Sequence, residues 1–82
     1  NASFSMFPNP ASDKVFIRSA EKIGHCFLRI QDATGRIVRE ESIAFNNSSA
    51  EISIKVLARA SYLIQLLDDK KKILFTVPLV KQ

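Results

Sequence analysis

Phe4-Ser5-Met6-Phe7-Pro8-Asn9-Pro10-Ala11-Ser12-Asp13-Lys14-Val15 is the stretch that most constrains the fold. Each proline ring fixes φ at about −65° and removes a backbone N–H, and the residues before the prolines are pushed toward extended conformations. A stiff segment that is poor in donors cannot lie in the middle of a sheet. We therefore predict an edge strand over Phe4–Phe7 that ends in a rigid bend and re-enters the fold at Asp13. The alternative is an ordinary loop with two prolines.

The composition fits one small folded domain. The chain has 82 residues, of which 46% are hydrophobic and 24% charged, and a domain of this size is marginally stable. Cys26 is the one cysteine, so no internal disulfide can add stability. No apolar run approaches the roughly 20 residues of a membrane-spanning helix. Because Asn1 has no methionine before it, we expect the chain to be part of a longer protein.

The formal charge of +4 is compatible with anionic partners, but most basic residues are scattered along the chain. Lys70-Lys71-Lys72 is the one cluster. It would either blunt an exposed sheet edge at a hairpin tip or dock to an anionic surface. No aromatic and basic strand motif accompanies it, so we expect no nucleic-acid partner.

Alternation of apolar and polar residues predicts about seven short strands and no amphipathic helix. The apolar faces of these strands are Val15 and Ile17; Cys26, Leu28 and Ile30; Ile52, Ile54 and Val56; Tyr62, Ile64 and Leu66; and Phe75, Val77 and Leu79. Regular short strands separated by turns are typical of a β-sandwich. The sequence therefore predicts an all-β, antiparallel sandwich.

The expected connections are short. Gly35 can adopt a positive φ and Asp32 can bond the backbone two residues on, so residues 32–35 predict a tight turn within a hairpin over residues 25–41. Residues 46–49 form a polar loop, residues 57–60 one helical turn or a bend, and residues 68–72 a charged hairpin loop. Pro78 predicts that the last strand, residues 73–80, lies at an edge or carries a bulge.

Several strands carry apolar residues on both faces. The surplus consists of Phe16, Phe27, Leu63 and Leu67. These side chains either pack locally against loops or form an exposed patch that binds a partner.

The residues offer no convincing reactive centre, so we expect no enzyme and no cofactor. His25 and Cys26 are adjacent, so on a strand they face opposite sides of the sheet, and one histidine and one cysteine are too few for a metal site. Within each of the acidic pairs 40–41 and 68–69, the two side chains are adjacent and would point to opposite sides of a strand for the same reason. Asn47-Ser48-Ser49 matches a glycosylation acceptor.

Four patterns occur in order along the chain. They are Phe4-x-x-Phe7-Pro8-Asn9-Pro10-Ala11-x-Asp13-x-Val15, Ile30-x-Asp32-x-x-Gly35-Arg36-x-Val38, Ser61-Tyr62-x-Ile64-x-Leu66, and Val80-Lys81-Gln82. Together they resemble the type A C-terminal sorting domain of the type IX secretion system, the Por system of Bacteroidota. The chain departs from that family at Ala60, where the family usually has glycine, at residues 68–72, which lack a glycine, and at Pro78.

The resemblance implies an immunoglobulin-like β-sandwich over residues 1–82, a single sorting domain at the end of a longer secreted protein. Its partners would be an N-terminal cargo domain, an outer-membrane translocon, a sortase-like peptidase that usually cuts upstream of the domain, and anionic lipopolysaccharide. The protein would pass through the periplasm to the cell surface or the extracellular space.

The residues that the resemblance assigns to recognition are Pro8, Asn9, Pro10, Asp32, Gly35, Tyr62 and Lys81. The prolines and Asn9 would shape the N-terminal edge, and Asp32 and Gly35 would set the central turn. Lys81 and the last strand would present the address. Tyr62 would anchor the core with its ring and fix a nearby loop through its hydroxyl. Two other functions stay open: an immunoglobulin-like adhesion or carbohydrate-binding module, and a structural module that packs against a larger enzyme.

Overall fold

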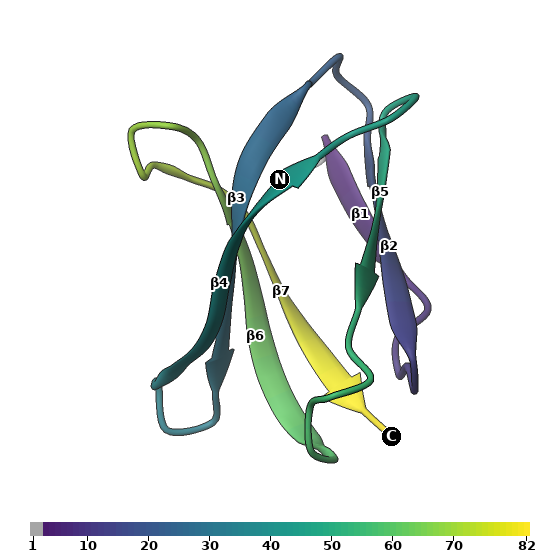
Figure 1. Ribbon diagram of the computed structural model, residues 1–82, viewed down its shortest axis with the longest axis vertical. Coiled ribbons are helices and arrows are strands. Elements are labelled where there is room, and N and C mark those ends of the chain that lie inside the picture. The colour runs from purple at the N-terminus through teal and green to yellow at the C-terminus, as the bar shows by residue number, and fades with distance from the viewer. Residues whose placement is uncertain (1–2) are drawn as a thin grey trace.

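The computed structural model describes residues 3–82 and shows an all-β protein (Figure 1). The expected domain therefore begins with two residues that lie outside the described part of the chain. The seven strands are β1 (Phe4–Phe7), β2 (Lys14–Ser19), β3 (His25–Asp32), β4 (Ile37–Ala44), β5 (Ser49–Ser53), β6 (Ala60–Leu67) and β7 (Ile73–Lys81). The described residues contain no helix, and hence none that is long and apolar enough to cross a membrane.

The strands form two antiparallel sheets. One has the order β1-β2-β5 and the other the order β4-β3-β6-β7. Figure 1 shows the two sheets as separate layers, and their inward-facing residues make one core. Val15, Ile17, Leu28, Ile30 and Ile64 are each 0% exposed. The predicted β-sandwich is confirmed, and it arises because the alternating apolar residues of both sheets point toward one another.

The predicted N-terminal edge strand is confirmed, and the plain-loop alternative is wrong. β1 occupies Phe4–Phe7 and pairs only with β2, with Phe4 opposite Ser19 and Phe7 opposite Phe16. Phe4 turns its ring inward, where it stacks on Phe75 of β7 with 5.5 Å between ring centroids. The first strand is thus anchored to the second sheet as well as to its own.

The central hairpin and the last strand follow the prediction. β3 and β4 pair as expected, although β4 continues to Ala44 rather than ending at Glu41. β7 lies at the edge of its sheet, and Pro78 sits within it. The segment between Ile54 and Ala60 is a bend, in which the Leu57 N–H donates to the Ile54 carbonyl.

Two expectations of the periodicity are wrong. Alternation predicts that Val56 faces the core, but β5 ends at Ser53 and Val56 is 89% exposed in the bend that follows. Alternation also places Leu67 on the outer face, but it is 2% exposed. The register of β6 and β7 shifts between Leu66 and Leu67, so that both side chains are buried.

Two of the other surplus apolar residues, Phe16 and Phe27, pack locally. The Phe16 ring stacks on Phe7 with centroids 5.8 Å apart. The Phe27 ring lies beneath the Lys71 ammonium, with 4.3 Å from Nζ to the ring centroid. Leu63 is half-buried. Local packing is therefore the better interpretation for the two rings.

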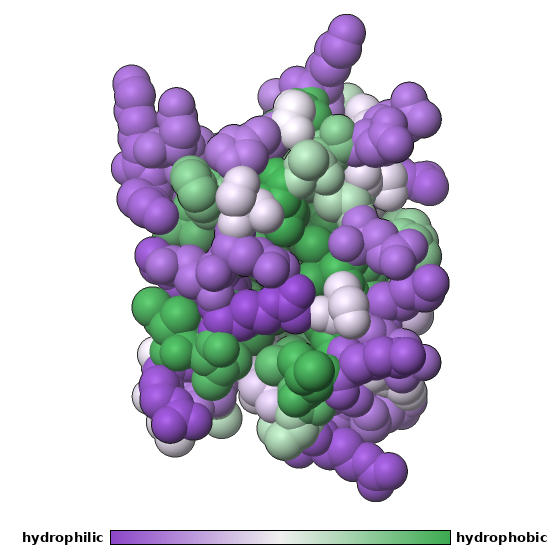
Figure 2. All heavy atoms as spheres, viewed as in Figure 1, coloured by the Kyte–Doolittle hydropathy of each residue, from purple (hydrophilic) through white to green (hydrophobic). Residues whose placement is uncertain are grey.

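The sandwich has two open sides, and a polar side chain bridges each. At the β4–β5 side, Arg39 donates from Nη1 to the Ser53 carbonyl and from Nη2 to Glu41, the latter over 2.6 Å. In Figure 2 hydrophilic side chains cover most of this face, and hydrophobic residues come to the surface mainly along the line between the sheets and at the lower end. The β1–β7 side is bridged by Asn9, which belongs to the candidate site.

Candidate functional site

Asn9 joins the N-terminal bend to the last strand. Its Nδ2 donates to the carbonyl of Pro78 over 2.7 Å, and its Oδ1 accepts from the N–H of Val80 over 3.0 Å. One side-chain amide therefore pairs with two backbone groups of β7, as a peptide group of a neighbouring strand would. Pro8 and Pro10 hold Asn9 from both sides and are exposed. We call this pairing the Asn9 clamp.

Ala11 extends this pairing toward the C-terminus. Its N–H donates to the Val80 carbonyl over 3.0 Å, and its carbonyl accepts from the Gln82 N–H over 2.8 Å. Ala11 and Lys81 thereby form a parallel β-bridge. The side chain of Ala11 is buried at 3% exposure. The segment that follows β1 and the C-terminal end of the chain thus share one short stretch of sheet edge, and Lys81, the last residue of β7, lies in it.

Asp32 builds the turn between β3 and β4. Its Oδ1 accepts from the N–H of Thr34 over 2.9 Å, from the hydroxyl of Thr34 over 2.6 Å and from the N–H of Arg36 over 3.0 Å. These bonds, led by that from the Thr34 hydroxyl, lower the pKa of the carboxyl below its usual value. Gly35 has a φ of 88°, which side chains rarely tolerate. The turn geometry predicted for Asp32 and Gly35 is therefore present.

Tyr62 lies one strand away, on β6. Its ring is part of the core, with the residue 8% exposed. Its hydroxyl donates to the carbonyl of Ala58 over 2.7 Å. The bond spans the bend that leads into β6, which is the anchoring geometry expected from the sequence. Ala60 needs no glycine, since its φ is not positive.

All seven expected site residues lie at one end of the sandwich. Tyr62 stands opposite Asp32 on one side and Leu79 on the other, and Ala60 stands opposite Lys81. In Figure 1 this end is the lower one, where the β3–β4 turn, the bend before β6 and the C-terminus lie close in height. Residues from the start, middle and end of the sequence are thus presented together.

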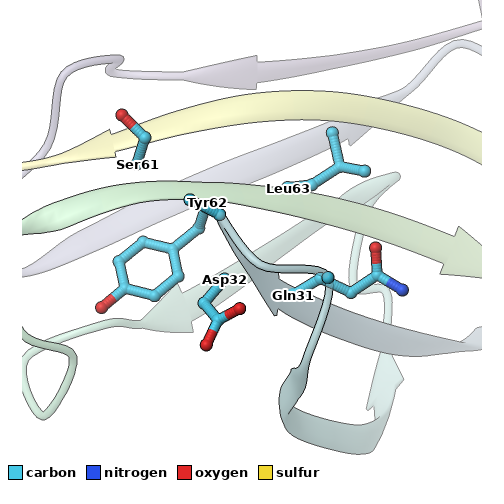
Figure 3. Close-up of a pocket in the computed structure, with 7 residues that line it drawn as sticks. Gln31, Asp32, Ser61, Tyr62 and Leu63 are labelled. Carbon is cyan, nitrogen blue, oxygen red and sulfur yellow. The ribbon is translucent and has the colours of Figure 1, made fainter.

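A shallow hollow of ≈ 310 Å³ opens between the β3–β4 turn and β6. Its lining includes Asp32, Gly35 and Tyr62, together with Ser61 and Leu63. Figure 3 shows the Tyr62 ring and the Asp32 carboxylate on the same side of β6, while Ser61 and Leu63 point to the other side. The remaining four expected site residues are not in its lining, so the hollow and the Asn9 clamp are two separate features of one end.

The side chains considered as nucleophiles, bases or metal ligands do not form a site in the described residues. His25 is exposed, whereas Cys26 is 1% exposed, and burial raises the pKa of its thiol to about 11. A neutral buried thiol is a poor nucleophile. Among residues 3–82 no three acidic, histidine or cysteine side chains are grouped so that they could hold a metal ion.

The sequence reasoning missed the partners of Asn9. It expected the last strand to present the address but did not place that strand beside Asn9, and the backbone groups of Pro78, Val80 and Ala11 complete this stretch of sheet edge. Pro78 carried a signal, because a proline in a strand indicates that its nitrogen faces away from the neighbouring strand. That outward side is where Asn9 binds.

The comparison with known families shows which family the chain belongs to. A family described as the secretion system C-terminal sorting domain matches residues 5–77, which include every expected site residue except Lys81. No curated protein and no solved structure matches the chain. Because the match covers most of the sequence, the chain belongs to the family of C-terminal sorting domains of the type IX secretion system.

Proposed function

We propose that residues 1–82 are a single non-catalytic sorting domain, read at the end that holds Pro8, Asn9, Pro10, Asp32, Gly35, Tyr62 and Lys81. Membership in the family implies an N-terminal cargo region, interaction with the type IX secretion machinery, and export across the outer membrane to the cell surface or extracellular space. The finer steps are part of the proposal. The domain passes through the periplasm, meets an outer-membrane translocon, and is released by a sortase-like peptidase that cuts upstream of it, with anionic lipopolysaccharide as a further partner of the cargo.

The observation that carries the proposal is the meeting of the segment that follows β1 with the C-terminal residues of β7. Ala11 and Lys81 pair in a β-bridge, and the Asn9 amide spans Pro78 and Val80. A receptor at this end could therefore test in one contact that the N-terminal motif and the terminal strand are both present and folded. Backbone groups at a sheet edge are the usual means by which an extended partner segment is bound.

The charges at this end favour an acidic receptor surface. Arg36 is an exposed cation beside the β3–β4 turn, with 79% of its side chain exposed, and its Nε lies 3.3 Å from Oδ2 of Asp32. Lys55 and Arg59 lie exposed in the bend before β6. Opposite charges steer association and fix the register of a complex. The acidic partner would complement these cations, which lie at the same end of the sandwich as the exposed prolines.

We also propose that the sandwich is immunoglobulin-like. The support is the strand order, β1-β2-β5 against β4-β3-β6-β7, and the tyrosine near the start of β6 whose hydroxyl bonds a carbonyl four residues upstream. Immunoglobulin-like domains carry a tyrosine in this position at the corner before the corresponding strand.

A fusion experiment tests the function. Residues 1–82 are joined to the C-terminus of a periplasmic reporter in a host that has the type IX pathway, and surface delivery is measured by protease access to intact cells. We expect delivery with the whole domain and retention in the periplasm when Leu79–Gln82 are removed. Equal delivery with and without these residues would contradict the role of the terminal strand, and no delivery with either would contradict the sorting function.

A further inference from the structure

The outer edge of β7 is covered over its last residues by the segment 8–11, which we call the strap. Four hydrogen bonds hold the strap in place. The Asn9 side chain makes two of them: it donates to the Pro78 carbonyl and accepts from the Val80 N–H. The Ala11 backbone makes the other two: its N–H donates to the Val80 carbonyl, and its carbonyl accepts from the Gln82 N–H. The strap runs parallel to β7 at this point.

Two of the four hydrogen bonds that hold the strap, those of the Asn9 side chain, are exposed. Pro8, Asn9 and Pro10 are exposed, and within the strap only Ala11 is buried. Its side chain is one methyl group, so the strap contributes little apolar burial. Segments with few buried apolar contacts and solvent-exposed hydrogen bonds are the ones that open locally without unfolding of the rest. Residues 8–10 of the strap meet both conditions, and Ala11 is its buried end.

Beneath the strap lies a regular edge. The carbonyls of Pro78 and Val80 and the N–H groups of Val80 and Gln82 all face outward and are spaced two residues apart, as in a strand that awaits a neighbour. The strap shows that this edge accepts hydrogen-bonding partners, a side-chain amide at Pro78 and Val80 and the backbone of Ala11 at Val80 and Gln82. Pro8 and Pro10 carry no N–H, so the bound strap offers few donors to any further strand.

We propose that the strap is a displaceable cover, and that the β7 edge from Pro78 to Gln82 is a docking site for an extended strand of a partner protein. The partner strand adds to β7 in place of residues 8–11 and takes over their four hydrogen bonds. The identification of that partner as a component of the type IX machinery rests on the proposed function. The cover itself is a property of the isolated domain.

Hydrogen exchange of the purified 82-residue chain tests the cover. Asn9→Ala removes the acceptor of the Val80 N–H directly, but the N–H groups of Ala11 and Gln82 keep their own partners. If the strap opens as a unit, all three amides exchange about ten-fold faster or more, as the loss of a hydrogen bond allows, while the amide of Leu79 stays protected. Asn9→Asp keeps Oδ1 and loses the donor, so its exchange should fall between that of the alanine variant and that of the unmodified chain. Unchanged exchange at Ala11 and Gln82 in the alanine variant would overturn the cover.

A peptide supplied in trans tests the edge. The probe is a synthetic peptide with the sequence of residues 7–12, and the control is the same peptide with alanine at the asparagine. A tethered strap competes at an effective concentration of about 1 mM or above, so millimolar probe should shift the NMR signals of Val80 and Gln82 in Asn9→Ala and leave the unmodified chain unchanged. Shifts elsewhere only, or equal shifts with the control peptide, would contradict a strand-binding edge.

A covalent lock tests the use of the edge in sorting. Ala11→Cys with Lys81→Cys places two thiols across the bridge, where neighbouring strands lie about 4.8 Å apart, within the range of a disulfide. Cys26 does not compete, because it is buried. In the reporter fusion the locked domain should stay in the periplasm, whereas the matched single variant Lys81→Cys should be delivered better than the locked domain.

Failure of the sorting function and failure of the displaceable cover give different results. If the unmodified fusion is not delivered, the sorting function fails, and the exchange and peptide experiments still decide on the cover. If the unmodified fusion is delivered and the locked domain is delivered as well as Lys81→Cys, the displaceable cover fails and the sorting function stands. The spectrum of the reduced double-cysteine variant shows whether these substitutions allow the domain to fold. If they do not, the Asn9→Ala experiments decide on the displaceable cover.

Discussion

Asp32 and Asp68 organise the two hairpin turns of the four-stranded sheet with the same hydrogen bonds. In each turn the carboxylate Oδ1 accepts from the N–H two residues on, over 2.9 Å in both, and from the N–H four residues on, over 3.0 and 2.8 Å. The aspartate carbonyl accepts from the N–H three residues on, over 3.0 Å in both. The turn predicted from Asp32-x-x-Gly35 thus occurs twice, the second time with Lys71 in place of the glycine.

The two carboxylates make the stability of the domain depend on pH. Hydrogen bonds, chiefly from the Thr34 hydroxyl at Asp32 and from the Lys72 N–H at Asp68, lower the pKa of both carboxyls below their usual value. The unfolded chain therefore binds protons before the folded chain as the pH falls, so the contribution is complete above the unfolded pKa and is lost as pH falls through the folded pKa. We expect stability to drop on acidification below about pH 4.

Asp32→Asn and Asp68→Asn check this assignment. Their urea midpoints, measured between neutral pH and strong acid, should lie below those of the unmodified chain at neutral pH and converge with them in acid, because asparagine does not titrate. Asp13 is an exposed aspartate outside both turns, so Asp13→Asn is the matched control that removes a carboxylate and leaves the turn bonds in place. Its neutral-pH midpoint should stay closer to that of the unmodified chain. Parallel profiles for all four proteins would contradict the assignment.

Gly35 and Lys71 form a matched pair for backbone strain, with φ values of 88° and 67°. A Cβ at Gly35 would meet no atom within 4 Å, so the cost of Gly35→Ala comes from the backbone alone. We expect a loss of about 1–2 kcal/mol in the free energy of unfolding. Lys71→Gly removes the same strain but also the contact of the ammonium with the Phe27 ring, so we expect a smaller gain, about 0.5 kcal/mol.

Chemical denaturation of the two variants measures both effects. In a Phe27→Leu background the gain from Lys71→Gly should be larger, because the contact with the ring has already been lost. A destabilised Lys71→Gly in that background would show that the second turn does not carry backbone strain.

The sequence predicted those parts of the fold that depend on neighbours along the chain. The strand faces followed from alternation, and the Asp32 turn followed from the conformations open to aspartate and glycine. Val56 and Leu67 were misplaced because periodicity does not indicate where a strand leaves its sheet or where a bulge lets two successive residues point inward. Both errors lie at strand ends, where the sheet rather than the local pattern decides.

In the candidate site, too, contacts between neighbours along the chain could be predicted and long-range contacts could not. The prolines beside Asn9 predicted a stiff edge, but the asparagine side chain bonds to Pro78, 69 residues away. No local pattern predicts that pairing. The Tyr62 hydroxyl, by contrast, finds its acceptor only four residues upstream, and its role could be predicted from the motif. Long-range partners became visible only when the proline segment and the end of β7 were placed on one sheet edge.

Asn47 and Ser48 form the two-residue turn between β4 and β5, with φ values of 54° and 63°. Asn46 and Ser49 close the turn with two hydrogen bonds, of 2.8 and 3.1 Å. Two positive φ angles define the hairpin turn that favours Asn-Gly, so Ser48 is the strained position. Ser48→Gly should raise the free energy of unfolding by about 0.5–1 kcal/mol, measured by urea denaturation. The matched change Ser53→Gly lies within β5 and should lower it; a loss of stability in Ser48→Gly would contradict the strain.

Tyr62→Phe isolates the bond that holds the bend before β6. The ring stays in the core, so the substitution removes only the hydroxyl and leaves the carbonyl of Ala58 without its donor. Ala58 is exposed, so water can replace the lost partner in part, and we expect a modest loss of about 1 kcal/mol in the free energy of unfolding. The amide of Leu57, which bonds Ile54 within the bend, should exchange faster while the amides of β3 stay protected. Unchanged exchange at Leu57 would show that the bend keeps its shape without the tyrosine hydroxyl, and the site would then not depend on it.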